Sequence, residues 1–192
     1  MRVHTIKNDL LQSCTYVLYD DTDFVFLVDC GEPRPIIEWL DENHKVVNSI
    51  FITHCHYDHI YGLSEIFKYN PHAQIFASSE TILGLRDENK NLSYIIGDVA
   101  FGADISNVHV IEEGNSHIGT LQVETFYTPG HSDDCYCYII ENKIFTGDSY
   151  IPHAKVFAKW PSSNRDLALK NETRIKDIIK QRNLTVYSGH WY

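Results

Sequence analysis

The sequence of 192 residues lacks the features that would direct it to a membrane or to a nucleic acid. Its N-terminus has no long apolar run typical of a secretory signal, and no apolar stretch approaches the length that spans a bilayer. It also lacks any run of Lys or Arg, and its 16 basic against 26 acidic side chains give a formal charge of −10. Because nucleic-acid binding requires a clustered basic surface, we predict a small-molecule substrate and no nucleic-acid or membrane partner.

Disulfide and linker patterns are missing as well. The five cysteines are odd in number and follow no framework spacing, which predicts free thiols and a cytoplasmic location. Cys55 is predicted to pack inside the protein, and Cys135 and Cys137 to lie in a core or sheet. With no internal repeat, low-complexity segment or Pro/Gly/Ser-rich linker, residues 1–192 are predicted to form a single domain, whose oligomeric state the sequence does not indicate.

What is present is an alternation of strand and helix patterns. Apolar and β-branched runs predict strands at 15–19, 24–28, 49–53, 74–77, 107–111, 121–127, 136–140, 143–146 and 184–187. Helical patterns cover 35–42, 63–69, 81–87 and 165–181, with Ser162, Ser163 or Asn164 as the cap of the last. The pattern of residues 84–120 is the least regular. Strands with a helix interspersed in each half predict an α/β (α+β) fold in which helices pack outside a pair of sheets.

The strongest chemical signal is the segment THCHYDH at 53–59, which follows a predicted strand. Imidazole nitrogens and carboxylate oxygens are the ligands that a divalent metal such as zinc takes in proteins. Because alternate residues leaving a strand point to the same side, His54 and His56 can share one metal. Asp58 and His59 lie past the bend, where they can turn toward a second metal.

Three further fragments place a ligand-type residue after a predicted strand and a small residue. TPGHS contains His131, FTGDS contains Asp148, and YSGH contains His190. Strand ends that present side chains from several segments are a usual way to build a rigid site. Each fragment is weak by itself, but their order along the chain adds to the first motif.

Together these motifs resemble those of the metallo-β-lactamase superfamily, and VDCG at 28–31 is similar to the family's strand-ending Asp-x-Gly. The resemblance implies a four-layer αββα sandwich with the site on one edge. It also implies two metal ions. One would be bound by His54, His56 and His131, and the other by Asp58, His59 and His190. Asp148 would bridge the two ions.

Within the superfamily, TPGHS and GDS are similar to the glyoxalase II-like, or hydroxyacylglutathione hydrolase-like, hydrolases. The segment RDENKNLSYIIG at 86–97 is similar to an Asn-Leu-Ser segment of that group. Only two residues follow His190 in this sequence. We therefore expect no C-terminal helical region of the kind with which full glyoxalase II proteins hold glutathione.

These ligands predict a binuclear metal-dependent hydrolase, with zinc as the expected metal and iron or manganese as alternatives. A metal pair lowers the pKa of bound water to near 7, so a bridging hydroxide can attack the carbonyl of a small thioester, ester or lactone. Asp58 or Asp148 would pass a proton to the departing group. The alternative is an oxidoreductase similar to persulfide dioxygenases, which would hold one iron on a subset of the same ligands.

Other residues have two interpretations each. Asp29 either hydrogen-bonds a ligand histidine or only fixes the turn before Gly31. Tyr150 either donates to substrate or packs at the rim. His153, Lys155 and Lys159 either form a basic site that binds an anionic substrate or lie in a solvated loop. The histidines outside these motifs are expected at the surface: His4, His44, His72, His109 and His117.

Overall fold

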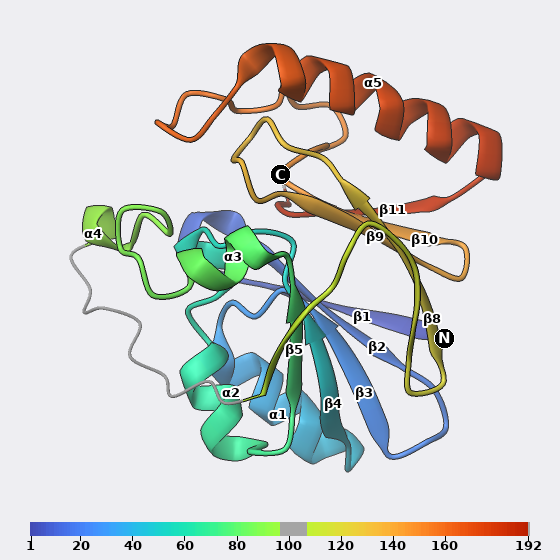
Figure 1. The fold of residues 1–192 in the computed structure, drawn as a ribbon. Helices are drawn as coiled ribbons and strands as arrows, with labels where there is room; N and C mark the ends of the chain where they lie inside the picture. Colours follow the sequence, from blue (N-terminus) through green and yellow to red (C-terminus); the bar gives the residue numbers. More distant parts are fainter. Residues whose placement is uncertain (97–106, 192) are drawn as a thin grey trace.

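A computed structural model of the protein describes residues 1–96 and 107–191. Two β-sheets form the centre of the molecule (Figure 1). The first sheet has the order β1-β2-β3-β4-β5-β6, with strands Arg2–Lys7, Cys14–Tyr19, Phe24–Val28, Val46–Phe51, Gln74–Ala77 and Val108–Val110. The second has the order β11-β10-β9-β8-β7, with β7 to β11 at Gly114–Ile118, Leu121–Tyr127, Tyr136–Ile140, Lys143–Gly147 and Thr185–Ser188. The helices are α1 to α5, at Pro33–Asn43, Leu63–Tyr69, Ser79–Gly84, Ser93–Ile96 and Arg165–Arg182.

Side chains alternate across each strand, and this alternation produces four layers. In β2 and β3, Val17 and Leu27 pack against buried residues of α1 and α2. Their neighbours Leu18 and Phe26 face the other way, into a cluster that contains Tyr138 of the second sheet. On the far side of that sheet, α5 packs against β9 and β10 (Figure 1). The resulting order of helices, sheet, sheet and helix is the predicted αββα sandwich.

Strand direction sets where the functional loops emerge. β3, β4, β5 and β6 run parallel in the first sheet, and β10 and β11 run parallel in the second. The carboxyl ends of neighbouring parallel strands lie at one edge of a sheet. Asp29 follows β3, the THCHYDH segment follows β4, and Asp148 and His190 follow β10 and β11. Sequence segments far apart in the chain therefore meet at one edge of the sandwich.

Most predicted elements are present, with shifts at their ends. The strand pairs β2–β3 and β9–β10 form antiparallel hairpins. Asn164, one of the three predicted caps, caps α5 because its Oδ1 accepts from the backbone nitrogens of Asp166 and Leu167. The helix predicted at 81–87 begins earlier, at Ser79, because the Ser78 hydroxyl accepts from the Thr81 nitrogen and caps it.

Two edge strands and a short helix were missed. The edge strand β1 buries only Ile6 and the edge strand β7 only Ile118, so neither carries the apolar alternation that reveals a strand. The short α4 belongs to the irregular 84–120 region. Within the described residues, no helix is both long and apolar enough to cross a membrane.

Candidate metal centre

The seven predicted ligand residues come together at the edge where the strands end. His54 and His56 lie in the loop after β4, and Asp58 and His59 lie in the 3-10 turn Tyr57–His59 that follows it. The turn after β8 supplies His131, and the ends of β10 and β11 supply Asp148 and His190. All are buried except His190, which is partly buried, so the cluster is shielded from bulk water.

Three imidazoles form the first group. The Nδ1 atom of His56 lies 3.1 Å from Nε2 of His54 and 2.9 Å from Nε2 of His131. Ligand atoms of the three residues all lie within 4.8 Å of one another. Three nitrogens at this spacing can share one metal ion, with His56 using Nδ1 and the other two using Nε2.

The second group combines imidazoles with carboxylates. Nε2 of His59 and Nε2 of His190 each lie 3.4 Å from Oδ2 of Asp58. Asp148 reaches both groups: its Oδ1 lies 3.4 Å from Nε2 of His59, and its Oδ2 lies 3.4 Å from Nε2 of His131 and 3.1 Å from Nε2 of His190. This position between the groups is the one required of a bridging carboxylate.

The outward nitrogens of four of the histidines have partners that fix the rings. Nδ1 of His59 lies 2.9 Å from a carboxylate oxygen of Asp29, and Nδ1 of His54 lies 3.1 Å from the Thr53 hydroxyl. The Nδ1 atoms of His131 and His190 lie 2.7 Å and 2.8 Å from the backbone carbonyls of Phe157 and Leu11. Carbonyl and carboxylate oxygens only accept, and the Thr53 hydroxyl already donates its hydrogen to Asp29. In all four histidines Nδ1 therefore donates, and the lone pair of Nε2 points into the cluster.

Burial and charge tune these groups toward metal binding. Burial lowers the pKa of His54 and of His56 well below the ordinary histidine value, which keeps both imidazoles neutral. Burial alone would raise the pKa of Asp148, but the imidazoles of His190, His131 and His59 lower it well below its usual range. Neutral imidazoles and an ionised carboxylate are the protonation states in which these side chains bind a metal.

Two buried atoms that face the cluster test whether a cation fits. Nε2 of His59 and Oδ1 of Asp148 make no hydrogen bond within the described part of the chain. A buried polar atom without a partner is costly, and these two atoms face each other at 3.4 Å. Burial alone would lower the pKa of His59, yet the carboxylates of Asp58, Asp29 and Asp148 raise it well above its usual value. The local field therefore favours positive charge at this point, and a divalent metal fits the donor set.

Two residues that were not among the predicted site residues hold the loops of the site in place. Asp134 is buried, and its Oδ2 accepts from the backbone nitrogen of Cys55 at 2.7 Å and from the Thr81 hydroxyl at 2.9 Å. A Cβ atom at Gly189 would lie 2.1 Å from Oδ1 of Asp148, so only glycine fits there. The two aspartates that follow TPGHS in the sequence could have pointed to Asp134. The carbonyl of Phe157 could not have been predicted as a partner, because every residue has a backbone carbonyl.

The other predicted candidates fall in different places. Asp29 contacts Nδ1 of His59, which is the first of its two interpretations, and it also accepts from the Thr53 backbone nitrogen at 2.8 Å. The ring of Tyr150 lies away from the cluster, against the residues under α5 and 5.4 Å from the Lys176 ammonium. Lys155 lines the pocket beside the metal-centre residues, whereas His153 lines a different cavity and Lys159 lines neither.

The cysteines and all of the unassigned histidines except His4 lie where the sequence predicted them. Cys55, Cys135 and Cys137 are buried free thiols. His44, His72, His109 and His117 are exposed, and His4 is half-buried, stacked on Trp39.

The Asn-Leu-Ser segment lies beside the cluster. The carbonyl of Asn91 accepts from the backbone nitrogen of Tyr57 at 2.8 Å, and its side-chain amide donates to the carbonyls of Gly84 and Leu85. These contacts hold Leu92 in the wall of the pocket. Gly97, the last residue of the segment noted in the sequence, lies outside the described residues.

Comparison with known proteins places the chain in a family. The model of the Metallo-beta-lactamase superfamily matches residues 9–190, so the chain belongs to the metallo-β-lactamase superfamily. It is 28% identical over 149 residues to the hydroxyacylglutathione hydrolase of Idiomarina loihiensis, covering 78% of this chain and 51% of that protein. It is 30% identical over 180 residues to the cytoplasmic isozyme of hydroxyacylglutathione hydrolase from Saccharomyces cerevisiae, covering 87% and 59%. The chain thus spans about half the length of these relatives.

Solved structures agree on the fold. The BLEG-1 B3 metallo-beta-lactamase has a TM-score of 0.88 at 24% identity, covering 100% of this chain and 92% of that chain. TTHA1623, crystallised in a di-iron-bound form, has a TM-score of 0.82 at 18% identity, covering 99% and 93%. Both similarities confirm the four-layer architecture reached from the strand patterns.

Proposed function

We propose that the protein is a binuclear metal-dependent hydrolase that cleaves the bond between the carbonyl carbon and the sulfur or oxygen of a small thioester, ester or lactone. The observation that carries this proposal is the meeting of seven histidine and aspartate side chains in two ligand groups, with Asp148 in contact with both. The names of the relatives support it, because hydroxyacylglutathione hydrolases act on a thioester and a β-lactamase acts on a cyclic amide.

The chain's own residues supply the framework for this chemistry. His54, His56 and His131 would hold one divalent cation, and Asp58, His59 and His190 would hold the other. When bound, such ions act as Lewis acids toward water and toward a carbonyl oxygen. Asp58 and Asp148 both line the pocket, so a carboxylate oxygen of either residue can carry the proton to the departing thiol or alcohol. No protein nucleophile is required.

Zinc is the proposed metal, because imidazole and carboxylate ligands suit it and it has no redox chemistry of its own. The di-iron form of TTHA1623 makes iron the second candidate. The two are separated by metal analysis together with oxygen consumption. One iron per chain, with oxygen uptake in the presence of a persulfide, would replace the hydrolase by the oxidoreductase alternative.

A cytoplasmic location is part of the proposal. All five cysteines are buried free thiols, as in a reducing compartment, and the yeast relative is named a cytoplasmic isozyme. The proposed partner is a small molecule alone, since the acidic net charge of −10 is unsuited to nucleic acid.

The test is a hydrolysis screen of the zinc-loaded protein on thioesters, esters and lactones, with Asp148→Asn beside it. The wild type should turn over at least one of these classes, and the variant should lose about a hundredfold or more in kcat. Asp133→Asn is the matched control, because this exposed carboxylate lies in the turn after His131. Turnover of Asp148→Asn within about threefold of the wild type would contradict the role of Asp148.

A further inference from the structure

The pocket that opens at the metal centre has mostly apolar walls. It has a volume of about 380 Å³ and includes the ligand residues His56, Asp58, His131, Asp148 and His190. Six large apolar side chains form most of the remaining wall, and we call this part the apolar pocket: Leu11, Leu92, Ile95, Ile151, Phe157 and Trp160. The sequence motifs indicated the candidate ligands but not this wall, which comes from three separate segments of the chain: the turn Leu10–Gln12, residues 92–95 and the connection between β10 and α5.

Several of these side chains lie open to solvent at the site. Leu11 is 61% exposed, Ile95 51% and Phe157 46%, while Leu92 and Ile151 are buried behind them. A contiguous group of exposed large apolar side chains at a reactive centre is typical of a ligand-binding surface, because covering it with an apolar group removes it from water.

The wall is tied to the metal ligands through the backbone. The carbonyl of Phe157 accepts from Nδ1 of His131, and the carbonyl of Leu11 accepts from Nδ1 of His190. The Ser163 hydroxyl accepts from the backbone nitrogen of Trp160 and donates to the carbonyl of His131. The apolar side chains are thereby held at a fixed distance from the ligand atoms, so a substrate carbonyl and its apolar group would be positioned together.

Charge argues against a polyanionic substrate. Among the described residues that line the pocket, Lys155 is the single lysine or arginine, and the two acidic residues there, Asp58 and Asp148, are metal-ligand candidates. Glutathione carries two carboxylates, and one lysine matches one at most.

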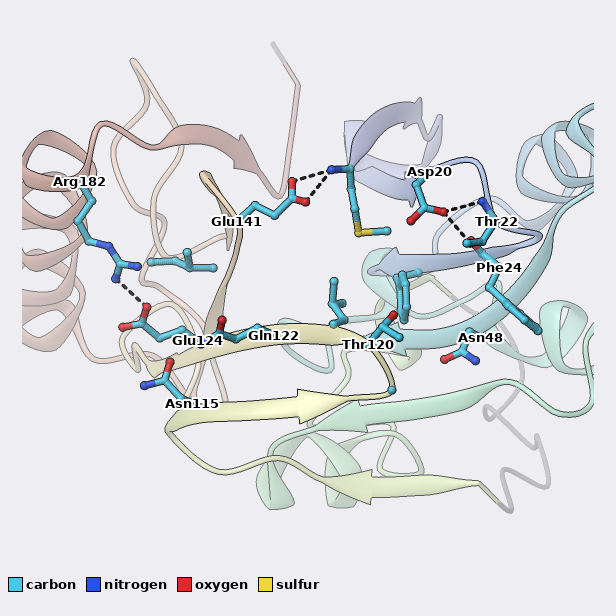
Figure 2. A pocket seen from close by; sticks show the side chains of 15 residues that line it. Asp20, Thr22, Phe24, Asn48, Asn115, Thr120, Gln122, Glu124, Glu141 and Arg182 are labelled. Atoms are coloured by element: carbon cyan, nitrogen blue, oxygen red, sulfur yellow. Dashed lines mark hydrogen bonds and ion pairs between the residues drawn. The ribbon is translucent and has the colours of Figure 1, made fainter.

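The larger cavity of about 640 Å³ lies elsewhere, near the start of β4 at Asn48, and includes none of the seven ligand residues. In that cavity the one basic side chain, Arg182, already pairs with Glu124 at 2.7 Å, as Figure 2 shows. It therefore offers no alternative place for the substrate of the metal centre.

We infer that the substrate is a carbonyl compound with no more than one anionic group, whose apolar group, on the acyl or the leaving side, fills the apolar pocket. This inference rests on the proposed hydrolysis. Each methylene buried in such a pocket should raise kcat/KM about fourfold until the pocket is full.

The first measurement is kcat/KM of the zinc-loaded protein for two series of neutral thioesters. One lengthens the acyl group from acetyl to butyryl to hexanoyl on N-acetylcysteamine, and the other keeps the acetyl group and lengthens an alkyl thiol. At least one series should rise about 15-fold for every two added methylenes. Equal values along both series, or a preference of more than about a hundredfold for the glutathione thioester of the same acyl group, would overturn the inference.

A matched pair of variants locates the effect. Phe157→Ala removes the aromatic wall but keeps the carbonyl that holds His131, and Phe24→Ala removes a phenylalanine of similar exposure, 51%, that lines the larger cavity. Phe157→Ala should flatten the dependence on chain length to less than twofold per methylene, while Phe24→Ala should leave it unchanged. Metal content is measured in both, and the same steep dependence in Phe157→Ala would contradict the inference.

A binding measurement keeps this inference separate from the proposed reaction. Alkyl methyl ketones are uncharged, carry the carbonyl and are not hydrolysed, so their dissociation constants can be measured by chemical-shift titration. Affinity should rise about fourfold per methylene from 2-pentanone to 2-nonanone and should fall in Phe157→Ala. If ketone affinity rises with chain length but no substrate is hydrolysed, the proposed function is contradicted and the binding role of the apolar pocket is supported. If substrates are hydrolysed but ketone affinity does not depend on chain length, only the role of the apolar pocket is contradicted.

Discussion

Asp29 shows how one side chain links the fold to the site. It has a positive φ of 58° directly after β3, which a non-glycine residue adopts only when its surroundings hold it there. One carboxylate oxygen accepts from the backbone nitrogen of Thr53, and the other contacts both the Thr53 hydroxyl and Nδ1 of His59. Asp29 is therefore a positioning residue, which orients His59 while it anchors the start of the THCHYDH segment.

Replacing Asp29 by Asn should weaken metal binding more than folding. If the asparagine amide faces His59, two donors meet there, and the imidazole loses the acceptor that sets its tautomer. Loss of such a partner typically costs 10- to 100-fold in metal affinity. Competition with a chromophoric chelator measures this affinity, and the thermal midpoint of the metal-free protein reports folding. An affinity within about twofold of the wild type would show that Asp29 only fixes the turn.

The cysteines should be unreactive in the native protein. All five thiols are buried, and burial raises the pKa of each, for Cys137 to about 12. Because the thiolate is the reactive form, at pH 8 a disulfide reagent should label less than about one thiol per native chain. All five should react after unfolding in denaturant. Rapid labelling of Cys55 in the native state would show that the loop after β4 opens.

At the scale of elements, the site depends on how closely the ends of β10 and β11 approach. The nitrogen of Gly189 donates to the carbonyl of Gly147 at 2.8 Å, which brings Asp148 and His190 side by side. A Cβ atom at position 189 would also lie 3.0 Å from Cε1 of His59. A side chain on this residue must therefore displace a ligand.

Gly189→Ala should accordingly lower metal affinity by about tenfold or more, since displacing Asp148 disturbs both ligand groups. The control is Gly119→Ala, in the turn between β7 and β8, where a Cβ meets nothing within 4 Å although its φ of +60° makes alanine somewhat unfavourable. Both variants should lose stability, but only Gly189→Ala should lose metal in a chelator competition. Unchanged metal affinity in Gly189→Ala would mean that the strand ends can separate without cost to the site.

Periodicity and ligand chemistry made most of this predictable from sequence. Elements with a buried face, such as β8 and α2, were predicted at their observed ends, because alternating or helical apolar spacing reflects burial directly. The seven candidate ligand residues, which the structure brings together, could be picked out because their residue types and spacing are rare outside metal sites.

Contacts that depend on tertiary structure were not predictable. The carbonyl partners supplied by Leu11 and Phe157 leave no trace in side-chain type, and the apolar pocket is assembled from loops without periodicity. The edge strand β7 could not be predicted either, because its exposed polar residues break the apolar alternation by which a strand is recognised. Tyr150 follows Asp148 closely in sequence, but the chain turns its ring toward α5.

For the whole molecule, the ligand residues join its two halves. His54, His56, Asp58 and His59 belong to loops of the first sheet, while His131, Asp148 and His190 belong to the second. A metal ion held by both sets would cross-link the sandwich and would stabilise only the folded state. Stability and metal binding should therefore change together.

Removal of metal should lower the thermal midpoint. Metal present at about a thousand times its dissociation constant contributes about 4 kcal/mol, which corresponds to about 10 °C for a chain of this size. Calorimetry of the zinc-loaded and chelator-treated protein measures the difference, and adding zinc back should restore it. An unchanged midpoint, with removal confirmed by elemental analysis, would show that the ligand residues are held in place without metal.

The most direct test of the two-metal centre is the zinc content per chain after loading and desalting, measured by elemental analysis. The wild type should retain about two ions, and His56→Ala should lose most of the first while keeping its fold. His72→Ala, which removes an exposed histidine outside the cluster, should retain the wild-type content. If His56→Ala retains the same zinc content as the wild type, the seven residues do not form the metal centre described here.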